Sequence, residues 1–300
     1  MSTFSQMTDE VARKLSGFTL RQEKQTSLSS TITASDLAIN IASSSNISTG
    51  VIQIDDELIY VDSYNKTTGV LTIPPYGRGY NGTTAAAHTA GARVIITPTF
   101  PNVDIKGAIN DTIMSMYPDL FAVTSYNFTY TPARVTYALP AEIETITSVS
   151  YESIGPSREW IPVRAWRHDS MSNESSFGNS PNSISIYSVV PAGRSIRIYY
   201  TKMPSTLTNA ADEFATVTGL PQSCQDVAIL GAAYRLASFI DPGRLTFASA
   251  ESDQQSQVAG RSYGSGTNTA KYLLSLYQDR LAQESSKLTG RFPIRIHYTR

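Results

Sequence analysis

The spacing of apolar residues alternates along this chain between the period of a helix and the period of a strand. The first helical stretch is "MTDEVARKLSG", where Val11 and Leu15 share one face. Thr8 is placed to cap its first turn, and Gly17 to end it. From about residue 28 to residue 97, apolar and polar residues alternate in strand-length runs separated by Asp, Asn, Ser and Gly. The pattern predicts a short helix followed by a β-rich module.

Helical spacing returns in "PNVDIKGAINDTIMSMYPDL", and Pro118 marks the end of that helix. Its apolar side is predicted to contain Val103 or Ile105, together with Ile109, Ile113 and Met116. A second β-rich block runs from about residue 122 to residue 202, and its short strands favour a small sandwich or barrel.

The last third of the chain is predicted to be helical. The segment "SCQDVAILGAAYRLASFID" is apolar nearly all round, so we expect it to be buried. A second helix, "NTAKYLLSLYQDRLAQESSKLTG", ends at Gly290. Its apolar stripe consists of Leu273, Leu276, Tyr277, Leu281 and Leu288.

Together these segments predict an α+β fold, a helical bundle built from N-terminal, central and C-terminal helices with two inserted β-rich modules. Such insertion is tolerated where the two ends of the insert lie close together. The predicted parts are an N-terminal bundle helix (1–19), a β module with an RGYNGT turn (20–99), a bundle helix (100–120), a second β-rich module (121–204), C-terminal bundle helices (205–290) and a basic extended tail (291–300).

Three adjacent carboxylates, Asp55, Asp56 and Glu57, lie between the alternating runs "VIQI" and "LIYV". This is where a hairpin turn belongs, and Asp is a common turn residue. Three carboxylates can also hold a cation, but no second group of ligands lies nearby in the sequence. We therefore expect a turn, with no metal site and no cofactor.

Charge and composition narrow the function classes. The 300 residues carry 24 Lys and Arg against 25 Asp and Glu, a net charge of -1, so no strong electrostatic footprint for nucleic acid or membrane is present. The 17 tyrosines against 10 phenylalanines suit β surfaces that make wet contacts with other proteins. The single Cys224 excludes an internal disulfide, and the absence of a long apolar run leads us to expect neither a signal peptide nor a membrane span.

Catalytic motifs are missing from the sequence. His88, His168 and His297 are isolated from one another, and none lies in a metal-binding pair or near a nucleophile elbow. The runs "WIPVRAWR" and "IRIYYTK" interleave aromatic and basic residues, as single-strand nucleic-acid platforms do, but half-exposed strands also show this alternation. We expect that the protein is not an enzyme.

The stretch "RGYNGTTAAAHTAGARVIITP" is predicted to be a structural turn. The pair Asn81 and Gly82 supplies positive φ, and Gly79 and Gly91 let the chain turn before the next strand. His88 is most simply a hydrogen-bonding peg that fixes this loop, rather than a ligand or a catalytic base.

A family resemblance adds to this reading. The segment from Gly50 to Pro98, with its "IDDE" hairpin, "RGYNGT" turn and "AAAH" run, resembles a module found in structural proteins of tailed bacteriophages. The order of N-terminal helix, this module, "DIKGAINDTIMSMYPDLF", a second β block and "AAYRLASFIDPGR" is similar to head-to-tail connector (adaptor) proteins of long-tailed phages. The resemblance implies a structural virion protein of the neck that is assembled in the host cytoplasm.

The resemblance also implies partners. Connector proteins form a ring, here expected to be dodecameric, between the portal protein and a stopper or tail-completion protein. Genomic DNA would pass through the lumen without specific binding, and near-neutral charge fits a channel in which DNA must slide.

Alternative functions remain open at this level. The same module would fit a tail or baseplate structural protein. A host-surface or carbohydrate-binding module would use Tyr residues with Trp160 and Trp166, although core positions are favoured for these aromatics. A hydrolase would use His88 or His168 in a set assembled in space.

The tail "RFPIRIHYTR" alternates apolar and basic residues at the period of a strand but has no hairpin partner beside it. It either completes the chain's own second β block, forms a mobile end, or pairs with the portal through its backbone and arginines. The residues of this predicted docking tail are Arg291, Phe292, Ile294, Arg295, Ile296, Tyr298 and Arg300.

Overall fold

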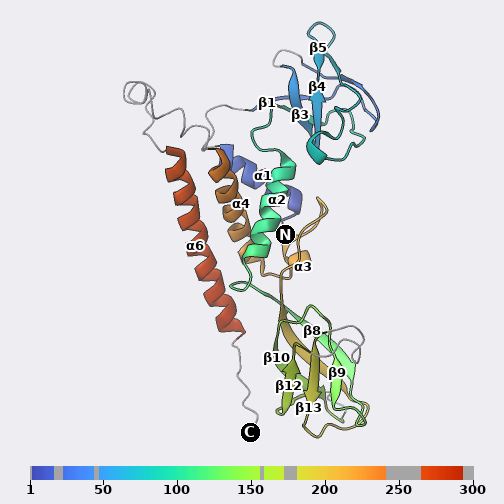
Figure 1. Cartoon of the computed structure of the whole chain (residues 1–300), viewed down its shortest axis with the longest axis vertical. Coiled ribbons are helices and arrows are strands. Elements are labelled where there is room, and N and C mark those ends of the chain that lie inside the picture. The colour runs from blue at the N-terminus through green and yellow to red at the C-terminus, as the bar shows by residue number, and fades with distance from the viewer. Residues whose placement is uncertain are drawn as a thin grey trace. The chain divides into compact units, whose positions relative to one another are not determined.

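A computed structural model describes residues 2–16, 23–43, 47–155, 159–171, 181–240 and 265–292 (Figure 1). The chain divides into two compact units. The first-module unit comprises Ser5–Ile109 and Ile229–Leu274, and the second-module unit comprises Met1–Phe4, Asn110–Ala228 and Ser275–Arg300. Each unit combines strands with helical segments.

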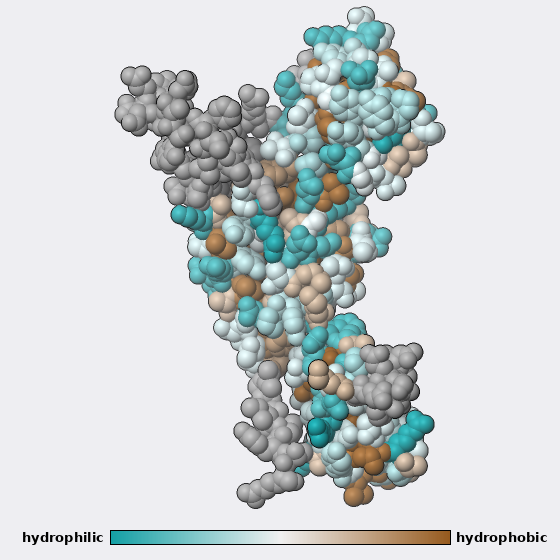
Figure 2. All heavy atoms as spheres, viewed as in Figure 1, coloured by the Kyte–Doolittle hydropathy of each residue, from teal (hydrophilic) through white to brown (hydrophobic). Residues whose placement is uncertain are grey.

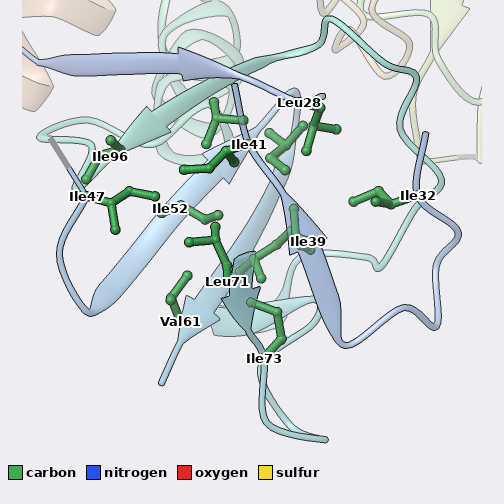
Figure 3. Close-up of a cluster of buried hydrophobic side chains, with 13 residues drawn as sticks. Leu28, Ile32, Ile39, Ile41, Ile47, Ile52, Val61, Leu71, Ile73 and Ile96 are labelled. Carbon is green, nitrogen blue, oxygen red and sulfur yellow. The ribbon is translucent and has the colours of Figure 1, made fainter. Parts of the chain in front are cut away.

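The first β module has two antiparallel sheets. One has the order β1-β7-β3-β4, and its strands are β1 (Lys24–Ser27), β7 (Arg93–Ile96), β3 (Gly50–Ile54) and β4 (Glu57–Val61). The other has the order β2-β6-β5, with β2 (Ala38–Asn40), β6 (Val70–Thr72) and β5 (Ser63–Asn65). Ile, Leu and Val side chains from both sheets and their connections point toward one another and form one core (Figure 3).

Helix α1 (Phe4–Ser16) begins earlier than the sequence predicts. Val11 and Leu15 are buried as expected, and Met7 extends the buried face by one turn. The predicted cap was wrong, because Thr8 lies inside the helix and is itself buried. Gly17, the predicted end, lies outside the described residues.

Helix α2 (Asn102–Ser115) confirms the helical spacing of the central segment. Ile105, Ile109 and Ile113 are fully buried, as is Met116 just after the helix. Val103 is 40% exposed, so of the two candidates for the first apolar position Ile105 is the buried one.

The second β module is a small sandwich, one of the two predicted forms. One sheet has the order β11-β10-β14-β8, with β11 (Trp160–Pro162), β10 (Thr145–Glu152), β14 (Ser195–Lys202) and β8 (Ala122–Thr129). The other has the order β12-β13-β9, with β12 (Trp166–Asp169), β13 (Ser183–Ile186) and β9 (Thr136–Ala138). Both sheets contribute to one buried cluster that includes Tyr137, Ile184 and Ile198.

The C-terminal region contains α3 (Phe214–Thr218), the 3-10 helix η3 (Gln222–Cys224), α4 (Gln225–Ile240) and α6 (Ser265–Arg291). Helix α4 is buried on several sides, as its apolar composition predicts. On α6 the ends of the predicted stripe, Leu273 and Leu288, are buried, whereas Leu276, Tyr277 and Leu281 are half-buried.

The prediction of a helical bundle with two inserted modules was wrong. Among the described residues the fold is a mixed α+β fold rich in sheet, with four sheets and five α-helices. The helical segments are divided between the two units, each of which also has its own sheets. The physical reason is that periodicity reveals which face of a helix is apolar but not what covers that face.

Candidate functional site

The hairpin between β3 and β4 turns at Asp55 and Asp56, as the sequence predicts. Asp55 has a φ of 52°, a conformation that short polar turn residues tolerate. Glu57 was expected in the same turn, and this was wrong. It is the first residue of β4, and its side chain is only 1% exposed.

Glu57 is enclosed by the segment from Arg78 to His88. Its Oε1 accepts hydrogen bonds from Arg78 Nε at 2.7 Å and from the Gly79 backbone N–H at 3.0 Å. Its Oε2 accepts from Arg78 Nη2 at 3.0 Å and from the Ala86 backbone N–H at 3.1 Å. His88 Nε2 lies 2.8 Å from the same Oε2. The Glu57 carboxylate thus contacts four residues of this segment.

These contacts keep Glu57 ionised. Burial alone would raise the pKa of this carboxyl, but hydrogen bonds from Arg78, the Ala86 N–H, His88 and the Gly79 N–H outweigh burial and lower its pKa. Because donors surround both oxygens, the carboxylate has no free side from which to bind a metal or abstract a proton. Within the ranges described, no cluster of His, Cys, Asp and Glu has the composition of a metal site.

His88 is hydrogen bonded on both ring nitrogens. Nδ1 lies 2.8 Å from Asp55 Oδ2, and Nε2 contacts Glu57. A carboxylate oxygen thus faces each nitrogen of the ring. Its backbone also pairs with Ile32 in an isolated bridge. His88 thus has a contact on each ring nitrogen, as a hydrogen-bonding peg requires. Whether His88 fixes the loop stays a prediction.

Arg78 is the residue of this cluster whose role sequence reasoning missed. Its guanidinium also donates to the carbonyls of Thr33, Asp36 and Ala86, and its side chain is only 5% exposed. The sequence signal for this role was the position of Arg78 between two glycines, in the same module as Glu57 at the start of a strand. A buried arginine requires such partners because an unpaired charge is costly to bury.

The turn has positive φ at Asn81 and Gly82, as the sequence predicts, and also at Gly79 and Gly91. Gly79, Asn81, Gly82 and Gly91 have φ values of 61°, 54°, 79° and 86°. Gly79 has a second constraint, since a Cβ there would lie 2.7 Å from the Thr83 carbonyl oxygen. A Cβ at Gly82 or Gly91 would meet nothing within 4 Å. Of these glycines, Gly79 is therefore the one that close packing requires.

Helix α2 is tied to the hairpin turn beside this cluster. The Asn102 backbone N–H donates to Gln53 Oε1 at 3.0 Å, and its side-chain amide donates to the Asp55 carbonyl at 2.8 Å. Lys106 forms an ion pair with Asp56. The hairpin turn is therefore held by contacts with α2 and by a contact with His88.

A second polar cluster lies in the second-module unit and was not predicted. Glu284 of α6 has a side chain that is only 2% exposed, and it accepts hydrogen bonds from Ser223 at 2.6 Å and Lys287 at 2.6 Å. Arg280 contacts both Glu284 and Asp226. Burial alone would raise the pKa of Glu284, but Lys287, Ser223 and Arg280 lower it. The cluster fastens this part of α6 to η3 and the start of α4.

Other predicted candidates are not brought together. Trp166 packs against the core of the second β module, as favoured, while Trp160 is half-buried beneath Arg197, whose guanidinium lies 3.8 Å from the ring centre. His168 lies on β12, in a different unit from His88. His297 lies outside the described residues.

Only the start of the predicted docking tail is described. Arg291 is the last residue of α6, one residue beyond the predicted stop, and its guanidinium lies 5.3 Å from the ring centre of Phe292. Ile294, Arg295, Ile296, Tyr298 and Arg300 lie outside the described residues, so the strand prediction for the tail stays a prediction.

The helices that the structure describes include none with the length and apolar character needed to cross a membrane.

Comparison with known proteins identifies the family. Residues 83–280, about two thirds of the chain, match the SU10 adaptor protein family. The match covers the end of the first β module, α2, the second β module, α4 and most of α6. It begins after the IDDE hairpin, so it does not test the resemblance seen there. A search of curated proteins found no match. The chain belongs to the SU10 adaptor protein family and is an adaptor-type structural protein of the phage virion.

Proposed function

We propose that this chain is a head-to-tail connector of a long-tailed phage. Copies would assemble into a ring between the portal and the next neck or tail component, with DNA passing through the ring. The observation that carries the proposal is the family match over residues 83–280, which takes in the second β module and most of the C-terminal helices.

The hydrogen bonding around Glu57 and His88 supports a structural role, in which the protein acts by its position in the virion and not by catalysis. In the part of the chain that the structure describes, the cluster of Glu57 and His88 uses its polar atoms in hydrogen bonds within the protein. Such a cluster holds a loop in place but offers no group for catalysis. We therefore propose that the protein is a structural part and not an enzyme.

Charge supports the passage of DNA through a ring. With 24 basic and 25 acidic residues the chain has no excess of cations to hold phosphates, and tight phosphate contacts would impede sliding. The ring is proposed to be dodecameric, to bind the portal on one side, and to offer the other side to a stopper or tail-completion protein.

Electron microscopy of the intact virion with symmetry determination tests the proposal. We expect density for the two β modules of this chain in a ring at the neck, in contact with the portal. Density in the tail tube or baseplate would instead support the alternative of a tail component. A chain absent from the virion would overturn both.

A further inference from the structure

Strand β8 forms one edge of the β11-β10-β14-β8 sheet, where it pairs with β14 along its whole length. Just beyond β8, the Tyr130 backbone N–H donates to the Arg194 carbonyl at 2.8 Å. Backbone groups of an antiparallel strand face the partner at every second residue, so counting back from Tyr130 identifies the residues that face away from β14. They are Val123, Ser125, Asn127 and Thr129. In the ranges that the structure describes, the backbone N–H and C=O groups of these residues have no hydrogen-bond partner.

The sequence of β8 lacks the features that usually protect an edge strand. Its eight residues, AVTSYNFT, contain no charge, proline or glycine, and its register with β14 runs without a bulge. The opposite edge of the same sheet is β11, which has three residues and ends in Pro162. Of these two edges, β8 is therefore the one that can accept another strand.

The side chains of β8 also indicate a further neighbour. Phe128 and Tyr126 lie opposite Ile196 and Ile198 of β14 and pack against the same core. The two isoleucines are 0% exposed, whereas the two aromatic rings are half-buried. A strand beside β8 with apolar side chains on this inner face would cover the rings. On the face of the module visible in Figure 2, hydrophobic residues form only small patches among hydrophilic ones, so this view shows no broad apolar surface as an alternative docking site.

The C-terminal tail has a sequence that matches this edge. Residues 293–300, PIRIHYTR, equal β8 in length. From 294 to 299, apolar or aromatic residues alternate with polar or basic ones: Ile294, Ile296 and Tyr298 with Arg295, His297 and Thr299. A strand with this alternation, laid along β8, places its apolar residues beside the half-buried rings and its polar residues on the outer face. Pro293, which has no N–H, stands at the first position, where a strand tolerates it.

The tail starts within reach of a β8 edge. Helix α6 and β8 both contact the short segment before α4: Ser223 donates to Glu284 of α6 at 2.6 Å, and a Cβ at Gly219 would lie 2.8 Å from Cβ of Ala122, the first residue of β8. From Glu284 the chain rises about 12 Å along the helix axis to Phe292. Eight extended residues then span about 26 Å.

We propose that residues 293–300 of one copy add to the β8 edge of the neighbouring copy, as a fifth strand of its sheet. The inference rests on the proposed function, because it takes the copies to stand in a ring. A ring requires contact between two different surfaces of the chain, and the tail and the β8 edge supply such a pair. The rotation that relates neighbours in a ring preserves height along its axis, so each tail starts near the level of the next copy's β8. The chain's own edge and the portal are the alternative acceptors.

Thiol cross-linking in assembled particles tests the proposal. A phage that lacks this chain is complemented with two differently tagged versions together, one with Asn127→Cys and one with His297→Cys, and treated with a short bis-maleimide. We expect a covalent pair of the two versions. In a matched control, Ser148→Cys replaces Asn127→Cys; Ser148 is also exposed on the outer face but lies on β10, two strands in from β8. Cys224 is buried, and versions without an added cysteine control for it.

Four outcomes would overturn the proposal. They are no link between the two versions, an equal link with Ser148→Cys, a link from position 297 to the portal, and a link that forms only inside a single chain carrying both added cysteines.

A backbone variant supplies a second readout. Ser125→Pro removes an N–H that faces the open edge, so it should lower the yield of the link by about tenfold or more. Ser125→Ala keeps this N–H and should leave the yield unchanged. Melts of both purified variants should lie close to the wild type, which shows that the lost link does not come from unfolding. An undiminished link with Ser125→Pro would refute pairing at this edge. Absence of the wild-type chain from the neck would instead refute the proposed function, which separates the two failures.

Discussion

His88 Nε2 lies 2.8 Å from Oε2 of Glu57, and both side chains are almost fully buried, at 3% and 1% exposed. The pair joins the start of β4 to the end of the segment from Arg78 to His88, 31 residues later in the chain. Arg78 forms an ion pair with the same carboxylate. Together the three side chains close the loop around one buried negative charge.

Removing the buried charge of Glu57 should destabilise the protein more than removing the exposed charge of Asp55. Glu57→Gln leaves the buried Arg78 without its counter-charge, so we expect a loss of about 3–5 kcal/mol in the free energy of unfolding. Asp55→Asn, at a carboxylate that is 65% exposed, is the control and should cost less than about 1 kcal/mol. Urea unfolding of the full chain measures both. Equal losses would mean that the buried cluster does not stabilise the module.

Loss of the histidine should have an intermediate effect. His88→Ala leaves acceptor positions on Glu57 and Asp55 without a donor, and we expect a cost of about 1–3 kcal/mol. His88→Gln retains a donor and should recover part of this. Thermal melts of the two variants decide whether the ring acts as a peg. A histidine that can be replaced by alanine without cost would remove that role.

Two glycines of the turn should respond differently to the same substitution. Both Gly79 and Gly82 have positive φ, but only at Gly79 would a Cβ collide with the Thr83 carbonyl. We expect Gly79→Ala to destabilise the module by more than the roughly 1 kcal/mol expected for Gly82→Ala, which adds only backbone strain. Parallel melts measure the difference, and a Gly82 variant as damaged as the Gly79 variant would contradict it.

Stability should fall in acid. The folded pKa values of Glu57 and Glu284 are lowered, so the unfolded chain binds protons on these residues more readily than the folded chain does. Their contribution is therefore present above the unfolded pKa, about 4.3, and is lost as the pH falls through the lower folded values. Melts from pH 7 to pH 3 test this. Glu284→Gln should reduce the loss of stability between pH 7 and pH 3 relative to the wild type. An unchanged loss would show that Glu284 does not contribute to it.

Cys224 should report on unfolding near the Glu284 cluster. The thiol is buried, and burial, with a smaller effect of the Glu284 charge, raises its pKa to about 11. Because the thiolate is the reactive form, we expect iodoacetamide at pH 8 to modify the folded protein far more slowly than the urea-unfolded protein. Mass spectrometry measures the rates. Similar rates in both states would show that the thiol is accessible in the folded protein.

The tail can be tested independently of the fold. Deleting Phe292 to Arg300 should leave the melting temperature nearly unchanged, because this segment follows the end of α6. If the tail docks on the portal, capsids should package DNA without retaining the truncated protein. Retention equal to that of the full chain, or failure to fold, would contradict the docking tail.

Local features of this protein follow from the sequence by itself. The 3.6-residue spacing placed Ile109 and Ile113 on the buried face of α2 and left Val103 or Ile105 as its first position. A hairpin turn at Asp55 and Asp56 followed from alternation on both sides of it. Positive φ at Asn81 and Gly82 also followed from residue type. These features depend on neighbours within a few positions, which is the range over which sequence patterns constrain the backbone.

Only the tertiary structure decided which distant groups meet. Glu57 was assigned to a turn because it follows two aspartates, yet the fold buries it against Arg78 and His88. Glu284 interrupts the predicted apolar stripe of α6, and it is buried with Ser223, 61 residues earlier in the chain, as a partner beside Arg280 of the same helix. The bundle was wrong for the same reason. Apolar periodicity indicates that one face of a helix is buried, while chain topology determines whether a helix or a sheet covers that face.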